Sequence, residues 1–353
     1  MRRMQNWVVK GKPIFIGLED SKKTWKVCVR CGGTIVQETG MPARFDVLKA
    51  YLQKNYPECD IHVMYEAGFR GFWLHDALVE AGVSCVVTPA HLVTQEKVNK
   101  VKTDRVDARR LSLNLENGDY SVCAVPDRER REDRQVVRTL TQVQRKITST
   151  KNQIRKFLDF HNLAPNLPAG SWKATQYARL RSLQLSSVLQ ICLDTYLDIL
   201  DHLADQRDRL KKQLEVIATK ERYREAVAIK ASCPGIGRLS ATRFTLEWGD
   251  LSRFPSGKSF ACYTGLTSRE HSSGEAVHRG RITGQGSGVV RGWLIQCAWR
   301  ALKKDPVLWD KFERVRSNSG SKKKAIVAVA RKLAVRLRAI DVARQMYVPA
   351  VIE

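Results

Sequence analysis

The sequence has 353 residues, which is long enough for two or three domains with cores of their own. Lys and Arg number 61 against 36 Asp and Glu, and the resulting net charge of +25 favours a polyanionic partner, most simply nucleic acid. No apolar run approaches the roughly 20 residues that cross a bilayer, and the first residues lack the apolar segment of a signal peptide. These features disfavour a membrane or secreted protein, and we expect a cytoplasmic one with no membrane partner.

The nine cysteines are an odd number and are scattered along the chain, which favours reduced thiols over a disulfide framework. Cys28 and Cys31 form one CxxC pair, but no second pair or histidine cluster follows at the spacing of a zinc site. We therefore expect no structural zinc.

The N-terminal third alternates between short strands and helices. An apolar run at 13–18 predicts a buried strand that ends in acidic residues, and Gly32-Gly33 predicts a hairpin between the next two strands. The predicted strands are 13–18, 24–30, 34–38, 61–65 and 83–87, and the predicted helices are 44–56 and 69–81. Three antiparallel strands followed by alternating helices and strands are the order of an α/β, RNase H-like domain.

Four acidic residues follow from this order as a candidate metal site. Glu19 ends the first strand and Glu66 follows the fourth, and these strands would be neighbours in such a sheet. Asp104 and Asp107 lie three apart in the helix-favouring segment 102–109, so their carboxylates leave one helix face about one turn apart. Four carboxylates suit Mg²⁺ or Mn²⁺ and indicate a two-metal phosphoryl-transfer site. The alternative is a solvated helix start that Lys102 and Arg105 neutralise.

The middle of the chain predicts two long helices. Apolar residues recur at helical spacing from Val136 to Leu158 and again from Leu189 to Ile217, with a proline-containing break at 161–171. The two stripes predict an antiparallel helical pair. It would be either an intramolecular bundle or a coiled-coil arm that also dimerises, and the charged outer faces favour the arm.

The C-terminal part combines a glycine turn, a serine and many cations. Residues 233–241 resemble the hairpin of a helix-hairpin-helix motif, although a plain tight turn is the alternative. Ser273 lies in a predicted polar loop at 267–274 and is a candidate nucleophile because arginines lie close in sequence. The residues expected to contact phosphate are Arg269, Arg279, Arg281, Arg291 and, at the start of the basic helix 322–338, Lys322, Lys323 and Lys324. A solvated face is the alternative for the lysines.

In this order, the segments resemble the DEDD transposases of the insertion-sequence-110 family, relatives of the Piv DNA invertase that are also called bridge recombinases. The resemblance covers nearly the whole chain. The segments that carry it are Gly17–Lys22, Tyr65–Gly68, Lys102–Arg109, Pro234–Gly237, Tyr263–Thr267, Ser272–Gly274 and Gly286–Arg291. Each is weak singly, and the set is specific.

The resemblance implies three domains. They are a RuvC-like (RNase H-like) catalytic domain at 1–126, a helical coiled-coil arm at 127–230, and a mainly α transposase domain bearing the serine at 231–353. The family's four acids match Glu19, Glu66, Asp104 and Asp107, and its nucleophile matches Ser273. The family usually has aspartate at the first position, so Asp20 is an alternative first ligand. Ser272 and Ser268 are lesser alternatives to the nucleophile.

The resemblance also implies a mechanism and partners. The acids would hold Mg²⁺ (or Mn²⁺), and Ser273 would attack the scissile phosphate, giving a covalent phosphoserine and a free 3′ hydroxyl. Strand exchange between donor and target double-stranded DNA would pass through a Holliday junction, guided by a structured noncoding RNA. The protein would act as a homo-oligomer, a dimer to a tetramer, in which different protomers donate the acid site and the serine. It would associate with the bacterial nucleoid when bound to DNA.

Two other functions remain open from the sequence. A metal-dependent junction-resolving nuclease would use the same acids with water as nucleophile, and it would not need Ser273. A non-catalytic nucleic-acid-binding protein would use the acids only as structure, so substitution of Glu66 or Asp107 would leave its function intact.

Overall fold

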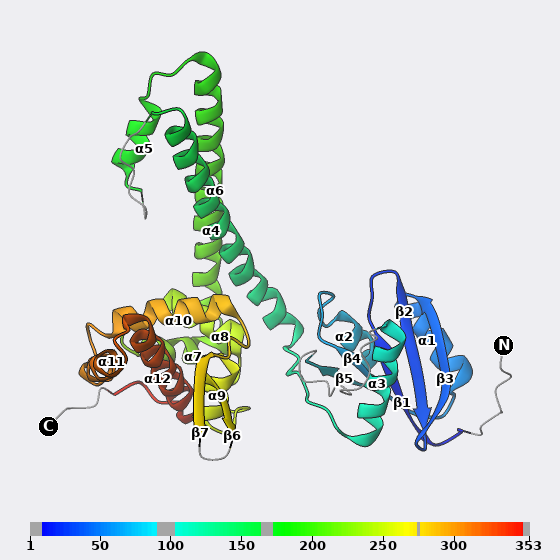
Figure 1. Ribbon diagram of the computed structural model, residues 1–353. Coiled ribbons are helices and arrows are strands. Elements are labelled where there is room, and N and C mark those ends of the chain that lie inside the picture. The colour runs from blue at the N-terminus through cyan, green and yellow to red at the C-terminus, as the bar shows by residue number, and fades with distance from the viewer. Residues whose placement is uncertain (1–8, 90–102, 164–171, 274–275, 349–353) are drawn as a thin grey trace. The chain divides into compact units, whose positions relative to one another are not determined.

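The computed structural model describes residues 9–89, 103–163, 172–273 and 276–348, and within these it describes no side chains for 271–279. The chain divides into two compact units, unit 1 at residues 1–126 and unit 2 at residues 127–353 (Figure 1). Among the described residues, no helix is both long and apolar enough to cross a membrane.

Unit 1 is a mixed sheet with helices packed on it. Its strands are β1 (Pro13–Glu19), β2 (Thr24–Cys31), β3 (Thr34–Pro42), β4 (Asp60–Glu66) and β5 (Ser84–Thr88). They lie in the order β3-β2-β1-β4-β5, with β1 antiparallel to β2 and parallel to β4. The five predicted strands are confirmed. So is the Gly32-Gly33 hairpin, where both glycines have the positive φ that a tight strand connection requires.

The alternation of side chains along the strands gives the sheet two apolar faces. One face, with Ile16 and Tyr65, packs against the buried leucines of α1 (Phe45–Asn55) and α2 (Trp73–Glu80). The other face presents Met64, which packs with Leu111 of α3 (Asp104–Asn117). Helix α2 begins four residues later than the sequence predicts, because the segment before it contains a turn at Gly71, whose φ is +70°.

Helix α3 approaches β1 very closely at Gly17. A Cβ added to Gly17 would lie 2.0 Å from the carbonyl oxygen of Ala108 and 2.4 Å from the amide nitrogen of Ser112. Only glycine permits this distance. The contact fixes α3 directly against β1, the strand that ends at Glu19.

Unit 2 is mostly helical. Its helices are α4 (Arg128–Phe160), α5 (Ala174–Arg181), α6 (Ser187–Thr219), α7 (Glu221–Ala231), α8 (Arg238–Trp248), α9 (Gly257–Tyr263), α10 (Gly288–Ala301), α11 (Pro306–Ser319) and α12 (Lys322–Ala343). The start of α4 joins the end of α6 in one core, and the end of α4 joins the start of α6 in another. The predicted antiparallel helical pair is therefore confirmed (Figure 1).

One predicted loop is wrong. The sequence predicts a polar loop at 267–274, but 268–273 form β6 (Ser268–Ser273), which pairs antiparallel with β7 (Ala276–Ile282). Gly274 lies outside the described residues. The sequence of β6 is SREHSS, which has no apolar alternation to signal a strand. Its pairing comes from backbone hydrogen bonds to β7, which local sequence does not display.

Candidate active site

The predicted carboxylates of unit 1 come from three elements. Glu19 is the last residue of β1, Glu66 is the last of β4, and Asp104 and Asp107 lie in the first turn of α3. Strands β1 and β4 are parallel with Leu18 opposite Tyr65, so they end at the same edge of the sheet. Helix α3 begins here with Thr103 as its N-cap, whose hydroxyl accepts a hydrogen bond from the Val106 amide at 3.4 Å.

The environment of Glu19 shifts its pKa strongly. The pKa of Glu19 is raised to about 7, first by burial and then by the charges of Asp104, Asp107, Asp20 and Glu66, in that order of effect. Its Oε2 atom is buried and has no hydrogen-bond partner among the described residues. A buried acceptor without a donor is costly, and this one is surrounded by negative charge. A cation would remove both penalties.

Arg110 balances part of this charge. Its guanidinium donates to Asp107 Oδ1 at 2.9 Å and to Glu66 Oε1 at 3.3 Å. In the part of the chain that the structure describes, no group of three or more His, Cys, Asp or Glu is arranged to hold a metal ion. The donor chemistry fits Mg²⁺ or Mn²⁺, but the ion would have to compete with Arg110 for Glu66 and Asp107. Sequence reasoning missed Arg110, although its i+3 spacing from Asp107 was the available signal.

Asp20 has partners of its own. The Trp25 indole donates to Asp20 Oδ1 at 2.8 Å, and Arg70 Nε lies 3.2 Å from the same oxygen. Arg70 also donates to the carbonyl oxygens of Ser21 and Lys22. Asp20 and Arg70 together therefore stabilise the turn between β1 and β2. Between the two candidates for first ligand, the unpartnered oxygen of Glu19 favours Glu19.

The arginines beside the α3 acids serve other partners. Arg109 forms a two-pronged ion pair with Glu38 of β3, and Arg105 lies 3.2 Å from the same carboxylate. Arg105 is therefore engaged away from Asp104, which weakens the interpretation of a simply neutralised helix start. Lys102 lies outside the described residues.

The predicted nucleophile lies in unit 2, at the end of a hairpin strand. Ser273 is the last residue of β6 and is paired with Ala276 of β7. The side chains of Ser273 and Arg279 lie outside the described part of the chain, as does Gly274. Arg269 and Arg281 are exposed on the same hairpin, and Arg269 donates to the Thr283 carbonyl oxygen at 3.4 Å.

Arg291 has a structural role besides its predicted contact with phosphate. Its guanidinium donates to the carbonyl oxygens of Thr264 at 3.4 Å and Gly286 at 3.2 Å, and also to that of Gln285. These bonds tie the end of α9 to the segment before α10. Arg291 therefore organises the base of the hairpin.

The basic residues of helix α12 are exposed at its start and hydrogen-bonded within the protein toward its end. Lys322, Lys323 and Lys324 are exposed in its first turn, while Ile326, Val329, Leu333 and Leu337 are buried as predicted. Arg336 donates to Asp305 Oδ2 at 2.6 Å, and Arg338 donates to the Phe254 carbonyl oxygen. The three lysines are thus the cations of this helix start that are open to a ligand.

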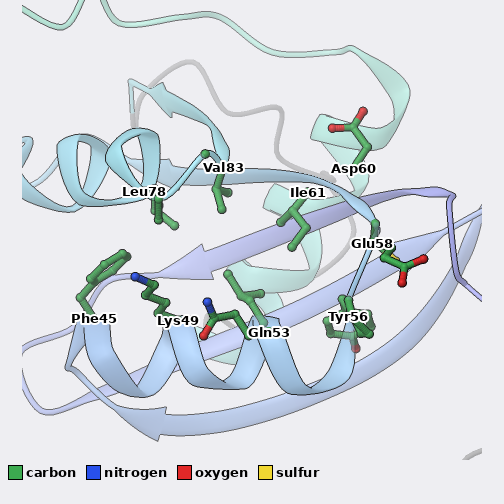
Figure 2. Close-up of a pocket in the computed structure, with 14 residues that line it drawn as sticks. Phe45, Lys49, Gln53, Tyr56, Glu58, Asp60, Ile61, Leu78 and Val83 are labelled. Carbon is green, nitrogen blue, oxygen red and sulfur yellow. The ribbon is translucent and has the colours of Figure 1, made fainter.

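Unit 1 also contains a pocket away from the acids. Figure 2 shows it beside α1, with Lys49, Tyr56, Asp60 and Val83 among the residues that line it, and its volume is about 370 Å³. Asp60 begins β4 and Glu66 ends it, so the pocket and the acidic cluster lie at opposite ends of that strand. None of the predicted catalytic residues lines this pocket.

Sequence comparisons match both units. A family model described as a transposase, of the DEDD type found in IS110 elements, matches residues 16–163. A second, described as the transposase IS116/IS110/IS902 family, matches residues 228–313. The first match contains Glu19, Glu66, Asp104 and Asp107, and the second contains Ser273.

Individual relatives agree with the family models. The protein y4rJ of Sinorhizobium fredii is 29% identical over 365 residues, covering 92% of this chain and 90% of the relative. The transposase for insertion sequence element IS1533 of Leptospira borgpetersenii is 23% identical, covering 70% of this chain and 73% of the relative. The pilin gene-inverting protein of Moraxella bovis is 29% identical, covering 41% of this chain and 46% of the relative. The chain belongs to the IS110 family of transposases, enzymes that recombine DNA.

Proposed function

We propose that the protein is the transposase of an insertion sequence and that it cuts and exchanges DNA strands with a metal-dependent acidic site and a serine nucleophile. Glu19, Glu66, Asp104 and Asp107 hold Mg²⁺ or Mn²⁺, and Ser273 attacks the scissile phosphate. The observation that carries this proposal is the buried Oε2 of Glu19, which has no partner among the described residues and lies in a group of carboxylates at one edge of the sheet.

We further propose that unit 1 is RuvC-like, within the RNase H-like class. The strand order β3-β2-β1-β4-β5, with only β2 antiparallel to its neighbours β1 and β3, supports this assignment, as does the position of α3 over β1. In unit 2 the pair α4 and α6 is the coiled-coil arm (127–230), followed by the serine-bearing domain (231–353). The length of these two helices, 33 residues each, supports an arm that reaches another protomer.

In this proposal the bound metal would neutralise charge on the scissile phosphate and polarise its oxygens. The residues of the chain prepare the site. Glu19 and Asp107 are held in place by β1 and α3, and Arg110 keeps Glu66 and Asp107 paired while no metal is bound. With those carboxylates bound to a metal, the guanidinium of Arg110 would be free to donate to a phosphate oxygen.

The proposed serine step conserves the phosphodiester bond energy. The Ser273 oxygen forms a bond to phosphorus, the bond from phosphorus to the 3′ oxygen breaks, and the serine proton ends on the released 3′ hydroxyl. The reverse attack by a 3′ hydroxyl of another strand frees Ser273 and joins the new strands. Two such exchanges on paired duplexes pass through a Holliday junction.

The proposed partners are donor and target double-stranded DNA and a structured noncoding guide RNA, bound by a homo-oligomer. The net charge of +25 supports the simultaneous binding of several nucleic-acid segments. The proposed phosphate contacts are the exposed Arg269 and Arg281 of the β6–β7 hairpin and the exposed lysines at the start of α12. Arg279 and Arg291 belong to the same proposed set.

A denaturing-gel assay tests the serine chemistry. Full-length protein is incubated with Mg²⁺, RNA transcribed from the element's flank, and matching labelled duplexes. We expect a covalent protein–DNA band in wild type and in Ser272→Ala, and none in Ser273→Ala or Glu66→Gln. Nicked DNA without a covalent band, persisting in Ser273→Ala, would instead support the junction nuclease with water as nucleophile. Omitting the RNA tests guidance, since the band should then disappear.

A further inference from the structure

A groove in unit 2 lies between the turn that joins α7 to α8 and the carboxyl end of α10. Its volume is about 820 Å³. It is lined by residues 231–237 of the turn and, from α10 and the residues after it, by Trp299, Arg300, Lys303 and Lys304. None of them is one of the four predicted acids of unit 1 (the acidic cluster), a residue of the β6–β7 hairpin that carries Ser273 (the serine hairpin), or one of the exposed lysines of α12.

One wall of the groove is backbone held rigidly against α10. Gly235 has a φ of +82°, and a Cβ there would lie 2.5 Å from the Cys297 carbonyl oxygen and 2.6 Å from the Ala301 amide nitrogen. The turn therefore packs on α10 with no side chain between them. Gly237 faces the other way, because a Cβ there would meet nothing within 4 Å. A ligand can approach the chain closely at Gly237.

The opposite wall is basic. Every charged residue of the lining is a cation, and Arg300, Lys303 and Lys304 are all exposed. None of these three cations forms an ion pair with an acidic side chain in the described ranges. Unpaired like charges gathered along one groove create a positive potential that attracts a polyanion.

An aromatic ring completes the groove. Trp299 is 44% exposed, and it packs edge-on against Phe312 with ring centroids 5.6 Å apart. A half-exposed indole beside a row of cations is the arrangement by which proteins bind single-stranded nucleic acid, with phosphates on the cations and a base on the ring. A duplex offers phosphates but keeps its bases stacked on one another, so it cannot use Trp299 in this way.

We propose that this groove binds a single-stranded stretch of nucleic acid. Backbone phosphates lie against Arg300, Lys303 and Lys304, and one unpaired base stacks on Trp299. The recognised chemistry is a phosphodiester strand with an unpaired base, which both a guide RNA and an opened DNA strand contain. The inference deepens the nucleic-acid binding of the proposed function, but it requires neither the metal nor Ser273.

The charge contribution is measured with the full chain in the absence of Mg²⁺. Fluorescence anisotropy follows binding of a labelled RNA strand of about 15 nucleotides, the DNA strand of the same sequence, and the corresponding duplex. The variant Arg300→Gln/Lys303→Gln/Lys304→Gln should weaken binding of both single strands at least tenfold. It should also lower the dependence of log K on log salt by about 0.7 for each phosphate that the variant no longer neutralises.

A matched variant removes the same charge elsewhere in unit 2. Arg145, Lys146 and Lys156 are exposed on α4, and their replacement by Gln should leave single-strand binding within about twofold of wild type, since distant exposed charges are largely screened. Equally weakened binding in the two variants would mean that the groove is not a site and would overturn the proposal. Comparing the RNA and DNA arms shows which strand the groove prefers.

The stacking contribution of Trp299 is tested against a second tryptophan, Trp309, which packs on the same phenylalanine ring. Trp309 is 51% exposed and also packs on Phe312, at 6.0 Å between centroids, but it does not line the groove. Trp299→Ala should weaken single-strand binding by roughly 5-fold to 100-fold, the range for removal of one stacked base, and should affect the duplex much less. Trp309→Ala should have no such effect. Equal weakening in the two tryptophan variants, or equal weakening for single strand and duplex, would overturn base stacking.

A third variant blocks the groove without disturbing the fold. Gly237 has a φ of −83°, is the N-cap of α8, and faces open space. Asp is favoured at an N-cap, so Gly237→Asp should keep or raise the melting temperature while placing a negative charge where phosphate would lie. Single-strand binding should fall at least fivefold. The proposal would be overturned if Gly237→Asp bound the single strands as tightly as wild type. It would also be overturned if a polyglutamate peptide, an anion without bases, outcompeted both strands.

The groove and the proposed catalysis can fail separately. Ser273→Ala and Glu66→Gln should bind the single strands as wild type does, because neither residue lies in the groove. Unchanged single-strand binding in the groove variants, with a covalent band still formed by wild type, counts against the groove alone. Absence of the covalent band from wild type, with single-strand binding abolished in the groove variants, counts against the catalytic proposal alone.

Discussion

At the scale of single residues, the acidic site of unit 1 is defined by what is left without a partner. Glu19 Oε2 is buried and has no hydrogen-bond partner in the described part of the chain, whereas Asp20, one position later, is bonded to Trp25 and Arg70. The two carboxylates are adjacent in sequence and differ completely in environment. That difference separates a candidate ligand from a residue that holds a turn.

The elevated pKa of Glu19 predicts a pH-dependent stability of the metal-free protein. Its pKa in the folded chain is about 7, above the 4.5 of an unperturbed glutamate, so the folded state binds this proton more tightly. The stabilisation is complete below pH 4.5 and is lost as the pH rises through 7. We expect the melting temperature in EDTA to fall between pH 5 and pH 8, and the fall to be smaller in Glu19→Gln. Glu58→Gln, at an exposed site, should retain the wild-type profile.

Arg110 predicts a destabilisation that metal reverses. Arg110→Gln leaves Asp107 and Glu66 without their guanidinium, and removal of such a partner from a largely buried charge costs about 1–3 kcal/mol. We expect lower stability in EDTA, measured by urea unfolding, and recovery when Mg²⁺ is added. Arg109→Gln is the control, since Arg109 pairs with Glu38 outside the acidic cluster. Equal recovery of both variants by Mg²⁺ would contradict the role assigned to Arg110.

At the scale of elements, one strand and one helix position the site. Helix α3 lies against β1 through the missing side chain of Gly17, and the same helix carries Asp104 and Asp107 in its first turn. The two acids are therefore placed by a contact more than eighty residues away in sequence. A displaced α3 would separate them from Glu19.

Gly17→Ala tests this contact. A methyl group there would meet the backbone of α3, which cannot move aside as a flexible side chain can, so we expect a decrease of about 1–3 kcal/mol or more in unfolding free energy. Mg²⁺ should stabilise this variant less than wild type, because the acids of α3 are displaced. Gly68→Ala is the control in the same unit, since its nearest neighbour would be 3.8 Å away and its stability should change little.

At the scale of the whole molecule, the two units have separate cores. The apolar clusters of unit 1 and those of unit 2 share no residue among the described positions. In unit 2 the core also encloses a charged pair, because Lys230 of α7 is fully buried and donates to Asp341 of α12. Burial lowers the pKa of Lys230, and the charge of Asp341 opposes that shift.

Asp341→Asn tests both the pair and the independence of the units. It leaves a buried lysine without its counter-charge, which typically costs about 3–5 kcal/mol. In calorimetry we expect two unfolding transitions. The midpoint temperature of one should be lower than in wild type, and that of the other should be unchanged. Lys230→Met/Asp341→Leu should recover most of the stability, since an apolar pair of similar volume needs no counter-charge. A single transition that shifts as a whole would show that the units unfold together.

The sequence by itself determined the elements and the composition of the acidic site. Period-two and period-3.6 patterns are local, so the strands of unit 1, the paired helices α4 and α6, and the apolar face of α12 were predictable from neighbouring residues. Glu19 and Glu66 were predictable as neighbours once the strand order was known, because parallel strands end at the same edge. The assignment of Ser273 came from resemblance, and its chemistry remains a prediction.

Only the tertiary structure decided which charged groups are engaged and which are open. Arg291 binds carbonyl oxygens at the base of the hairpin, Arg105 pairs with Glu38, and Arg110 bridges two of the four acids. The groove at Trp299 also depends on two segments, 231–237 and 299–304, that meet only after folding. The physical reason is the same in each case. Each of these arrangements includes a partner remote in sequence, such as Glu66 for Arg110, Glu38 for Arg105 and Thr264 for Arg291, and no local pattern encodes that partner.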